Sequence, residues 1–164
     1  MTTQLENAVL EEIEHEAVAT GKLLDRIPEG KLGWRPHPKS MSLGELALHV
    51  ATIPATVAAA LEAGEAEATD LLTHPGARSL VEVHAAWDRT MAYLRQNPIP
   101  ASDGKWIVRH GGKVAVTLPK SAVSRFLMLN HWYHHRGQLT VYLRLLEVPL
   151  PAVYVASADE NPFG

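Results

Sequence analysis

The chain has 164 residues, of which 46% are hydrophobic and 20% are charged, as expected for one globular domain with a real core. Its formal net charge is −3 and its basic residues are scattered, so charge gives no reason to expect nucleic-acid binding. Cysteine is absent, which excludes disulfides, thiolate nucleophiles and cysteine metal ligands. We therefore expect a single domain over residues 1–164, in which any soft metal site uses histidine and carboxylate.

The first six residues are polar and acidic, unlike a signal peptide. We also expect no apolar run to approach the length that crosses a bilayer. The interpretation is a cytoplasmic protein with no membrane or nucleic-acid partner.

The first helix is predicted to begin at the capping box formed by Thr3 and Glu6 and to run to about Arg26. Proline and glycine in residues 28–30 end it. The following segment is too rich in these residues for a helix, and Trp34 is expected to pack along the side of the helices.

A second capping box, formed by Ser42 and Glu45, predicts a helix that continues to about Ala63. Pro54 lies a few turns inside it and predicts a kink or a local break. His49 falls at the semi-polar border of the apolar face of this helix, on the side that Glu45 shares.

Residues 64–78 are predicted to form a loop, after which Ser79 and Glu82 make a third capping box. The apolar side chains of the helix that follows are spaced 3, 4, 4 and 3 residues apart, which indicates a period of 3.6. They are Leu80, Val83, Trp87, Met91 and Leu94.

Residues 106–109 and 114–117 flank the turn Gly111-Gly112 and predict a short β-hairpin. Two strands alone are marginal in water, so this hairpin must lean on the helices. A long last helix is predicted from about Lys120 to Glu147, and a tail follows that is ordered only if residues 153–155 dock on the helices.

Four amphipathic helices with intermediate connections predict an all-α fold, an antiparallel four-helix bundle with a possible short hairpin before the last helix. The order of the helices in the bundle is left open.

The last helix carries His131 and His135, which lie one turn apart and can direct two imidazoles at one point, as a metal ion requires. A helical wheel places both in the predicted buried stripe, with His134 at its margin and Arg136 off it. The other residues within about 40° of His131 on this wheel are Leu127, Gln138, Tyr142 and Leu145.

A third histidine from a facing helix would complete a face of three nitrogens for a divalent cation, and His49 is the candidate. Gln138 is expected to hydrogen-bond to a ligand and Arg136 to pair with a carboxylate. Hydrogen-bonded structural histidines are the alternative. Trp132 stands where a zincin metalloprotease needs its catalytic glutamate, so the sequence does not support this class of protease. It also has no Gly-x-Ser-x-Gly motif, so it does not support a serine hydrolase of that type.

These motifs resemble those of the DinB/YfiT-like metalloenzyme family over nearly the whole chain. The most specific of them is the His-Arg-Gly-Gln stretch. The stretches that carry the resemblance are Asn130-His131-x-x-His134-His135-Arg136-Gly137-Gln138, Ser42-Leu43-Gly44-Glu45-Leu46-x-x-His49, Trp34-Arg35-Pro36 and Tyr154-x-x-Ser157-Ala158-Asp159-Glu160.

The resemblance implies a homodimer of four-helix bundles, with a divalent metal held by His49, His131 and His135. Nickel or zinc is expected, and iron is possible. Some members of the family are thiol-dependent S-transferases that use bacillithiol or mycothiol, one branch includes a maleylpyruvate isomerase, and most have no assigned reaction.

Three functions follow as hypotheses. The first is a metal-dependent enzyme, either a thiol-dependent S-transferase acting on small electrophiles or a hydrolase. The second is a non-catalytic metal- or ligand-binding stress-response protein. The third is a helical interaction protein whose histidines are structural. The sequence assigns no catalytic side chain.

Overall fold

The computed structural model describes residues 4–97, 99 and 104–163. The chain is mostly helical, with a small three-stranded sheet. The helices of two turns or more are α1 (Gln4–Leu24), α2 (Leu43–Ala63), α4 (Leu80–Gln96) and α6 (His131–Leu145). The shorter elements are η1 (Glu29–Lys31), α3 (Ala68–Leu71), α5 (Lys120–Val123) and the π-helical segment η2 (Ser124–Asn130).

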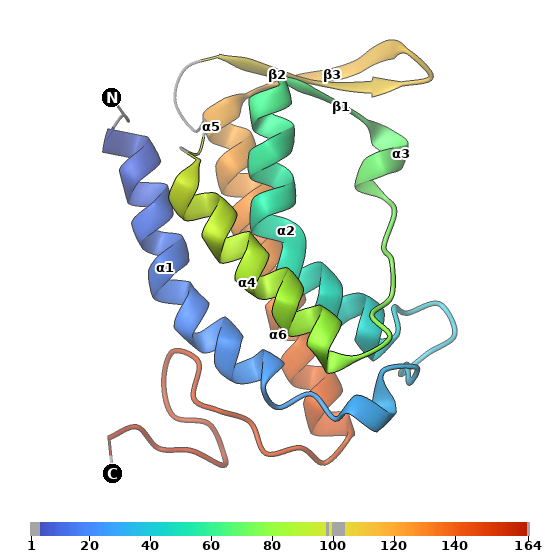
Figure 1. Ribbon diagram of the computed structural model, residues 1–164, viewed down its shortest axis with the longest axis vertical. Helices are drawn as coiled ribbons and strands as arrows, with labels where there is room; N and C mark the ends of the chain where they lie inside the picture. The colour runs from blue at the N-terminus through green and yellow to red at the C-terminus, as the bar shows by residue number, and fades with distance from the viewer. Residues whose placement is uncertain (1–3, 98, 100–103, 164) are drawn as a thin grey trace.

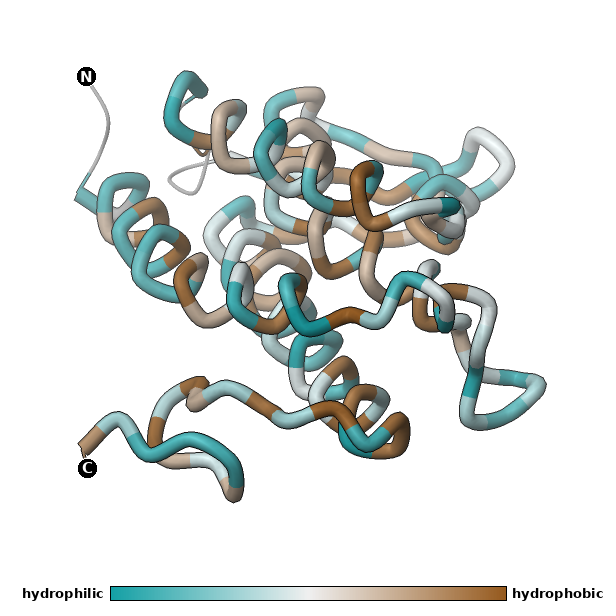
Figure 2. Tube along the Cα trace, turned by 60° about the horizontal axis from the view of Figure 1, so that its bottom comes forward, coloured by the Kyte–Doolittle hydropathy of each residue, from teal (hydrophilic) through white to brown (hydrophobic). Residues whose placement is uncertain are grey.

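The long helices lie against one another over most of their length (Figure 1). α2 packs on α4 and on α6, and α1 packs on the same two helices. Teal and brown alternate along α1 in Figure 2, as an amphipathic helix requires. The expected all-α fold is therefore confirmed only in its coarser form, a mostly helical chain with a small sheet.

The sheet lies at one end of the helices and the C-terminal tail at the other (Figure 1). The predicted hairpin is confirmed as β2 (Lys105–His110) and β3 (Lys113–Pro119), antiparallel and joined at Gly111 and Gly112. Both glycines have positive φ, 57° and 75°, which glycine adopts without steric cost.

The predicted loop over residues 64–78 needs correction, because it contains the strand β1 (Glu65–Glu67) and the helix α3. β1 pairs in parallel with β2. Its sequence, Glu-Ala-Glu, carries no strand signal, and the pairing depends on backbone groups and on position.

The hairpin leans on the helices, as expected. The Trp106 indole is buried and its Nε1–H donates to the carbonyl of Ala60 at the end of α2 (2.8 Å). Leu61 and Val123 pack beside Trp106 in a small apolar cluster that is separate from the main core between the helices.

The capping box that starts α2 is present in both directions: Ser42 Oγ accepts from the Glu45 N–H, and the Glu45 carboxylate accepts from the Ser42 N–H. At α4 only half of the predicted box forms, because the Glu82 carboxylate accepts from the Arg78 N–H instead. Thr3, which belongs to the first predicted box, lies outside the described residues.

At Pro54 the sequence predicted a kink or a local break of the helix. α2 continues through Pro54, so the local break is absent. Among the described residues, one helix is long and apolar enough to cross a membrane by length and composition, and it is α2. The expectation that no apolar run approaches this length was therefore wrong. Half of this apolar stretch is buried inside the protein, as in the core helix of a soluble fold, so its length and composition are weak evidence for a membrane span.

The buried stripe of α6 differs from the predicted one. Its fully buried residues are Trp132, Arg136, Leu139 and Leu143. His131 and His135 are half-buried at its border, and Leu145, which the wheel placed in the stripe, is 56% exposed. The prediction erred by about one residue because it treated Arg136 as a surface residue.

Arg136 is buried because its guanidinium finds partners far away in the sequence. It pairs with the Glu16 carboxylate at 2.5 Å and donates to the Thr20 hydroxyl and to the Tyr154 hydroxyl of the tail. The expected pairing with a carboxylate is thus present. The expected docking of residues 153–155 holds for Val153, which packs on the main core. Tyr154 and Val155 are 64% and 67% exposed, and Tyr154 is held through its hydroxyl group, which accepts from Arg136.

Candidate metal centre

His49 reaches the site from the second turn of α2, where the capping box fixes the start of the helix. Its ring is half-buried and meets both histidines of α6 edge-on. The ring centroids lie 5.1 Å from His131 and 4.5 Å from His135.

His131 and His135 occupy the first two turns of α6, with ring centroids 4.6 Å apart and ring planes at 69°, an edge-on arrangement. The neighbour of His131, Trp132, is fully buried and its Nε1–H donates to the carbonyl of Val50, the neighbour of His49 (3.0 Å). This buried hydrogen bond joins α6 to α2 next to the site and explains why the three imidazoles meet.

The Nε2 atoms of the three histidines point at one another. The distance from His131 Nε2 to His49 Nε2 is 3.4 Å, and to His135 Nε2 it is 2.8 Å. One ring nitrogen from each residue lies within 4.8 Å of the others. Tetrahedral ligands at a Zn–N distance of 2.0–2.1 Å stand about 3.3 Å apart, so the group could hold a metal ion after small side-chain movements.

Hydrogen bonds at the Nδ1 atoms of His131 and His135 give both rings the same tautomer, with the hydrogen on Nδ1. His135 Nδ1 lies 2.8 Å from Gln138 Oε1, and His131 Nδ1 lies 3.3 Å from the carbonyl of Leu127. Both partners are acceptors, so each Nδ1 donates its hydrogen and each Nε2 of a neutral ring keeps its lone pair. The predicted contact of Gln138 is thus present, in the arrangement typical of residues that support a metal ligand.

Burial keeps these imidazoles unprotonated. It lowers the pKa of His49 to about 3, with the nearby rings of His135, His74 and His131 acting in the same direction. Burial and His131 lower the pKa of His135 to about 4, and burial lowers the pKa of His131 as well. At neutral pH all three are in the form that binds metal.

The other residues named from the sequence lie outside the cluster. His134 is exposed, with its ring 5.0 Å from that of His135. Glu45 serves its capping box and lies 3.6 Å from Arg35, and in the described ranges no hydrogen bond joins it to His49. Its hydrogen bonds with Ser42 hold the pKa of the carboxyl below its usual value.

A fourth histidine, His74, lies beside the site and was missed in the sequence. It sits in the segment between α3 and α4, with its ring 4.4 Å from that of His49. Its Nδ1 is buried and has no hydrogen-bond partner among the described residues. The proximity of His74 to the site becomes apparent only in the folded structure, because its sequence spacing from the other histidines matches no helical or metal-binding pattern.

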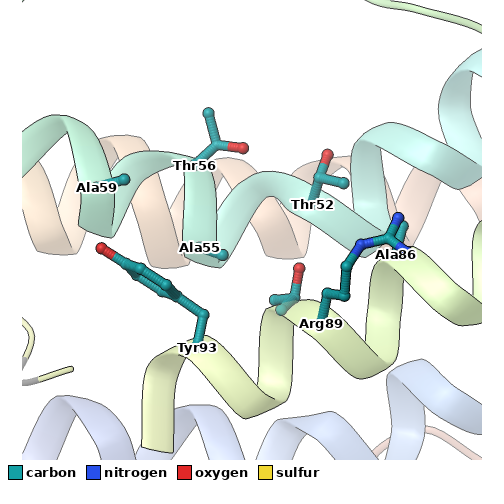
Figure 3. A pocket seen from close by; sticks show the side chains of 8 residues that line it. Thr52, Ala55, Thr56, Ala59, Ala86, Arg89 and Tyr93 are labelled. Atoms are coloured by element: carbon teal, nitrogen blue, oxygen red, sulfur yellow. The ribbon is translucent and has the colours of Figure 1, made fainter. Parts of the chain in front are cut away.

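Two hollows flank this part of α2. A cavity of about 290 Å³ includes His49 and His131 in its wall. Next to it, an open groove of about 370 Å³ runs between α2 and α4, with Ala59 from α2 and Arg89 and Tyr93 from α4 along it (Figure 3). Thr52 and Thr56 line both the cavity and the groove. This groove contains none of the three histidines among its described lining residues.

The model of the DinB family matches residues 1–161. The chain belongs to the DinB family. Among solved structures, the DinB-like protein YjoA of Bacillus subtilis is similar to this DinB-family chain, with 22% identity, a TM-score of 0.66 and coverage of 89% of this chain and 96% of that one. A DinB-like protein of Bacillus cereus shows 24% identity and a TM-score of 0.64, and covers 90% and 97%.

Likeness at this level of identity establishes the fold of the DinB-family chain and nothing about its reaction. No curated protein matches the chain.

Proposed function

We propose that this DinB-family protein binds one divalent cation through Nε2 of His49, His131 and His135. The observation that carries the proposal is the convergence of three neutral imidazoles. With both Nδ1 hydrogens donated elsewhere, the lone pairs of His131 Nε2 and His135 Nε2 face each other at 2.8 Å. Such a contact is repulsive unless a cation or a proton lies between the nitrogens.

The donor set favours nickel or zinc, and iron is compatible with it. Neutral imidazole suits all three metals, so ligand type alone leaves the choice to geometry and availability. Three protein ligands also leave coordination positions for a small molecule, which is the arrangement typical of catalytic rather than structural zinc sites.

We further propose that the protein is a metal-dependent S-transferase that joins a low-molecular-weight thiol to a small electrophile. A bound divalent cation would supply a Lewis acid that lowers the pKa of a coordinated thiol. The protein's own residues keep the three imidazoles neutral and oriented, and the cavity beside His49 and His131 gives a second reactant a place to bind. Membership of a family that includes such transferases adds support.

Metal content of untagged protein tests the first proposal. Dialysis against nickel or zinc is expected to leave about one metal per chain in the wild type, and elemental analysis is expected to find none in His49→Ala and His135→Ala. His134→Ala is the matched control, because this exposed neighbour has no place in the cluster and its metal content should not change. Equal metal in all four proteins would refute the site.

A conjugation assay tests the second proposal. Several thiols are offered with small electrophiles to metal-loaded protein and to metal-loaded His134→Ala, and the metal-free His135→Ala variant gives the background rate. The proposal predicts a rate above background in the two loaded proteins. No excess rate for any thiol, with metal still bound, would instead support a non-catalytic metal-binding protein.

A further inference from the structure

The cavity beside the histidines is built by three parts of the chain. α2 forms one wall, the segment that includes α3 forms the second, and η2 with the start of α6 forms the third. The lining residues with apolar side chains are Leu48, Ile53, Val57, Leu71, Pro75 and Leu127. His49 in the first wall and His131 in the third are lining residues too, so the cavity adjoins two of the three histidines of the candidate metal centre.

Few polar groups in this cavity are free to bind a ligand. The Thr52 hydroxyl donates to the carbonyls of Leu48 and His49, one turn back in its own helix. The Thr73 hydroxyl likewise donates to the carbonyl of Thr69 (3.1 Å). Thr56 is a further hydroxyl, at an exposed position of the rim. Most of the wall is therefore hydrocarbon, and the threonines leave few hydrogen bonds for a ligand.

The charge of the lining disfavours anions. Asp70 is the single carboxylate among the described lining residues, and none of these residues is a lysine or an arginine. An anion in the cavity would lose hydration and meet the Asp70 carboxylate without a compensating cation other than the metal.

The volume limits the size of the ligand. The volume of about 290 Å³ is just below the range of typical ligand pockets, which runs from about 300 to 1,000 Å³. A single small ring or short aliphatic group fills such a space.

We infer that this cavity is the substrate pocket of the proposed metal centre and that it takes a small, uncharged, mainly apolar molecule whose donor atom faces the three histidines. The inference rests on the proposed function and names the class of its electrophile. In this arrangement, apolar contact with the cavity wall selects substrates by size and hydrophobicity, and coordination to the metal orients the bound molecule.

Cobalt(II)-loaded protein allows a direct test, because ligand binding changes its visible spectrum. The probes are 4-phenylimidazole, which is neutral and apolar, and 4-(imidazol-4-yl)benzoate, which has the same metal-binding ring and phenyl group with a carboxylate too remote to reach the metal. Because this carboxylate would lose hydration in an apolar cavity, 4-phenylimidazole is expected to bind at least about tenfold more tightly.

Variants at the rim distinguish the cavity from its surroundings. Thr56→Trp should fill the cavity and weaken 4-phenylimidazole binding at least about tenfold, without loss of cobalt. Ala59→Trp is the matched control, because Ala59 is exposed on the same helix and lines only the groove toward α4. Asp70→Asn should narrow the difference in affinity between the two probes by strengthening the binding of 4-(imidazol-4-yl)benzoate.

The outcomes separate this inference from the proposed function. If cobalt binds but 4-(imidazol-4-yl)benzoate binds as tightly as 4-phenylimidazole, or Thr56→Trp binds 4-phenylimidazole like the wild type, the pocket assignment is overturned and the metal centre stands. If the wild type binds no cobalt, the metal centre fails and the pocket assignment fails with it.

Discussion

The three imidazoles are arranged at a cost to the metal-free protein. Their nitrogens are half-buried, unprotonated and directed at one another, which removes water without supplying a full set of hydrogen bonds. A cation placed among His49, His131 and His135 would satisfy all three lone pairs at once. The site is therefore preorganised for metal, which predicts that residues supporting the imidazoles influence affinity.

Gln138 is one such residue, because its Oε1 accepts from His135 Nδ1. Gln138→Leu is expected to weaken zinc binding about 10- to 100-fold by releasing the ring orientation. Gln138→Glu keeps an acceptor and should retain most of the affinity. Competition with a chelator measures both dissociation constants, and equal values for Gln138→Leu and the wild type would contradict the supporting role.

The depressed histidine pKa values predict acid sensitivity of the metal-free protein. An unfolded histidine has a pKa of about 6.5, whereas in the folded chain the pKa of His49 is about 3 and that of His135 about 4. Between these values the unfolded chain binds more protons, so the stability present above pH 6.5 is lost as the pH falls toward 4.

Urea denaturation of metal-free protein at several pH values measures this loss. The double variant His49→Gln, His135→Gln should show a shallower decrease over the same range. The linkage is disproved if wild type and double variant lose stability in parallel.

Spacing could identify two of the ligands, because His131 and His135 are four residues apart on a strong helix. His49 was placed by its position on the apolar face and by the resemblance. His74 could not be predicted, since a loop residue carries no periodicity and its approach to His49 depends on tertiary folding. Metal binding by the three histidines stays a prediction.

In α6, the hydropathy pattern alone did not predict the buried face of the helix correctly. Hydropathy assigns an arginine to the surface, yet Arg136 lies in the centre of the buried face because Glu16 and Thr20 satisfy its guanidinium. These partners lie in α1, more than one hundred residues away. The predicted buried stripe of α6 was therefore displaced by about one residue from the observed one, so that it centred on the histidines instead of on Arg136.

The π-helical segment before α6 is a second feature that periodicity did not predict. Ser124–Asn130 winds more widely than an α-helix, and the carbonyl of Leu127 within it accepts from His131 Nδ1. π-helical turns recur at functional sites, where they reposition side chains and backbone groups. Here the segment supports a candidate ligand.

The start of α2 is the element that aims His49, and local sequence predicted it well. Ser42→Ala is expected to destabilise the protein by about 1 kcal/mol, because the N–H of Glu45 loses its acceptor. Ser40→Ala, which removes a hydroxyl outside the cap, should have little effect. Chemical denaturation compares the two, and an equal loss in both variants would contradict the capping account.

Across the whole molecule, Arg136 joins parts that are remote in sequence. Its guanidinium contacts Glu16 of α1 and Tyr154 of the C-terminal tail, and it lies over the rings of Trp132 and Tyr133. The tail is thereby held against α1 and α6 at the end of the helices opposite the sheet (Figure 1).

Arg136→Met is expected to cost about 3–5 kcal/mol, because the largely buried Glu16 carboxylate loses its partner. Arg144→Met, which breaks an exposed pair with Asp159, is the comparison and should cost much less. Urea unfolding gives both losses. A small loss for Arg136→Met would show that Glu16 finds water or another partner instead.

The sequence could indicate a helical chain with a hairpin, because amphipathic periods and turn glycines are local signals. The strand β1 needed the folded sheet to be recognised. The four-helix bundle as such, a homodimer and a cytoplasmic location stay predictions.

The most direct measurement of the central claim is a crystal structure of zinc-loaded protein with anomalous data at the zinc edge. One anomalous peak is expected, at about 2.0–2.1 Å from Nε2 of His49, His131 and His135. An anomalous peak held by other residues, or no peak among these three rings at full zinc loading, would contradict it.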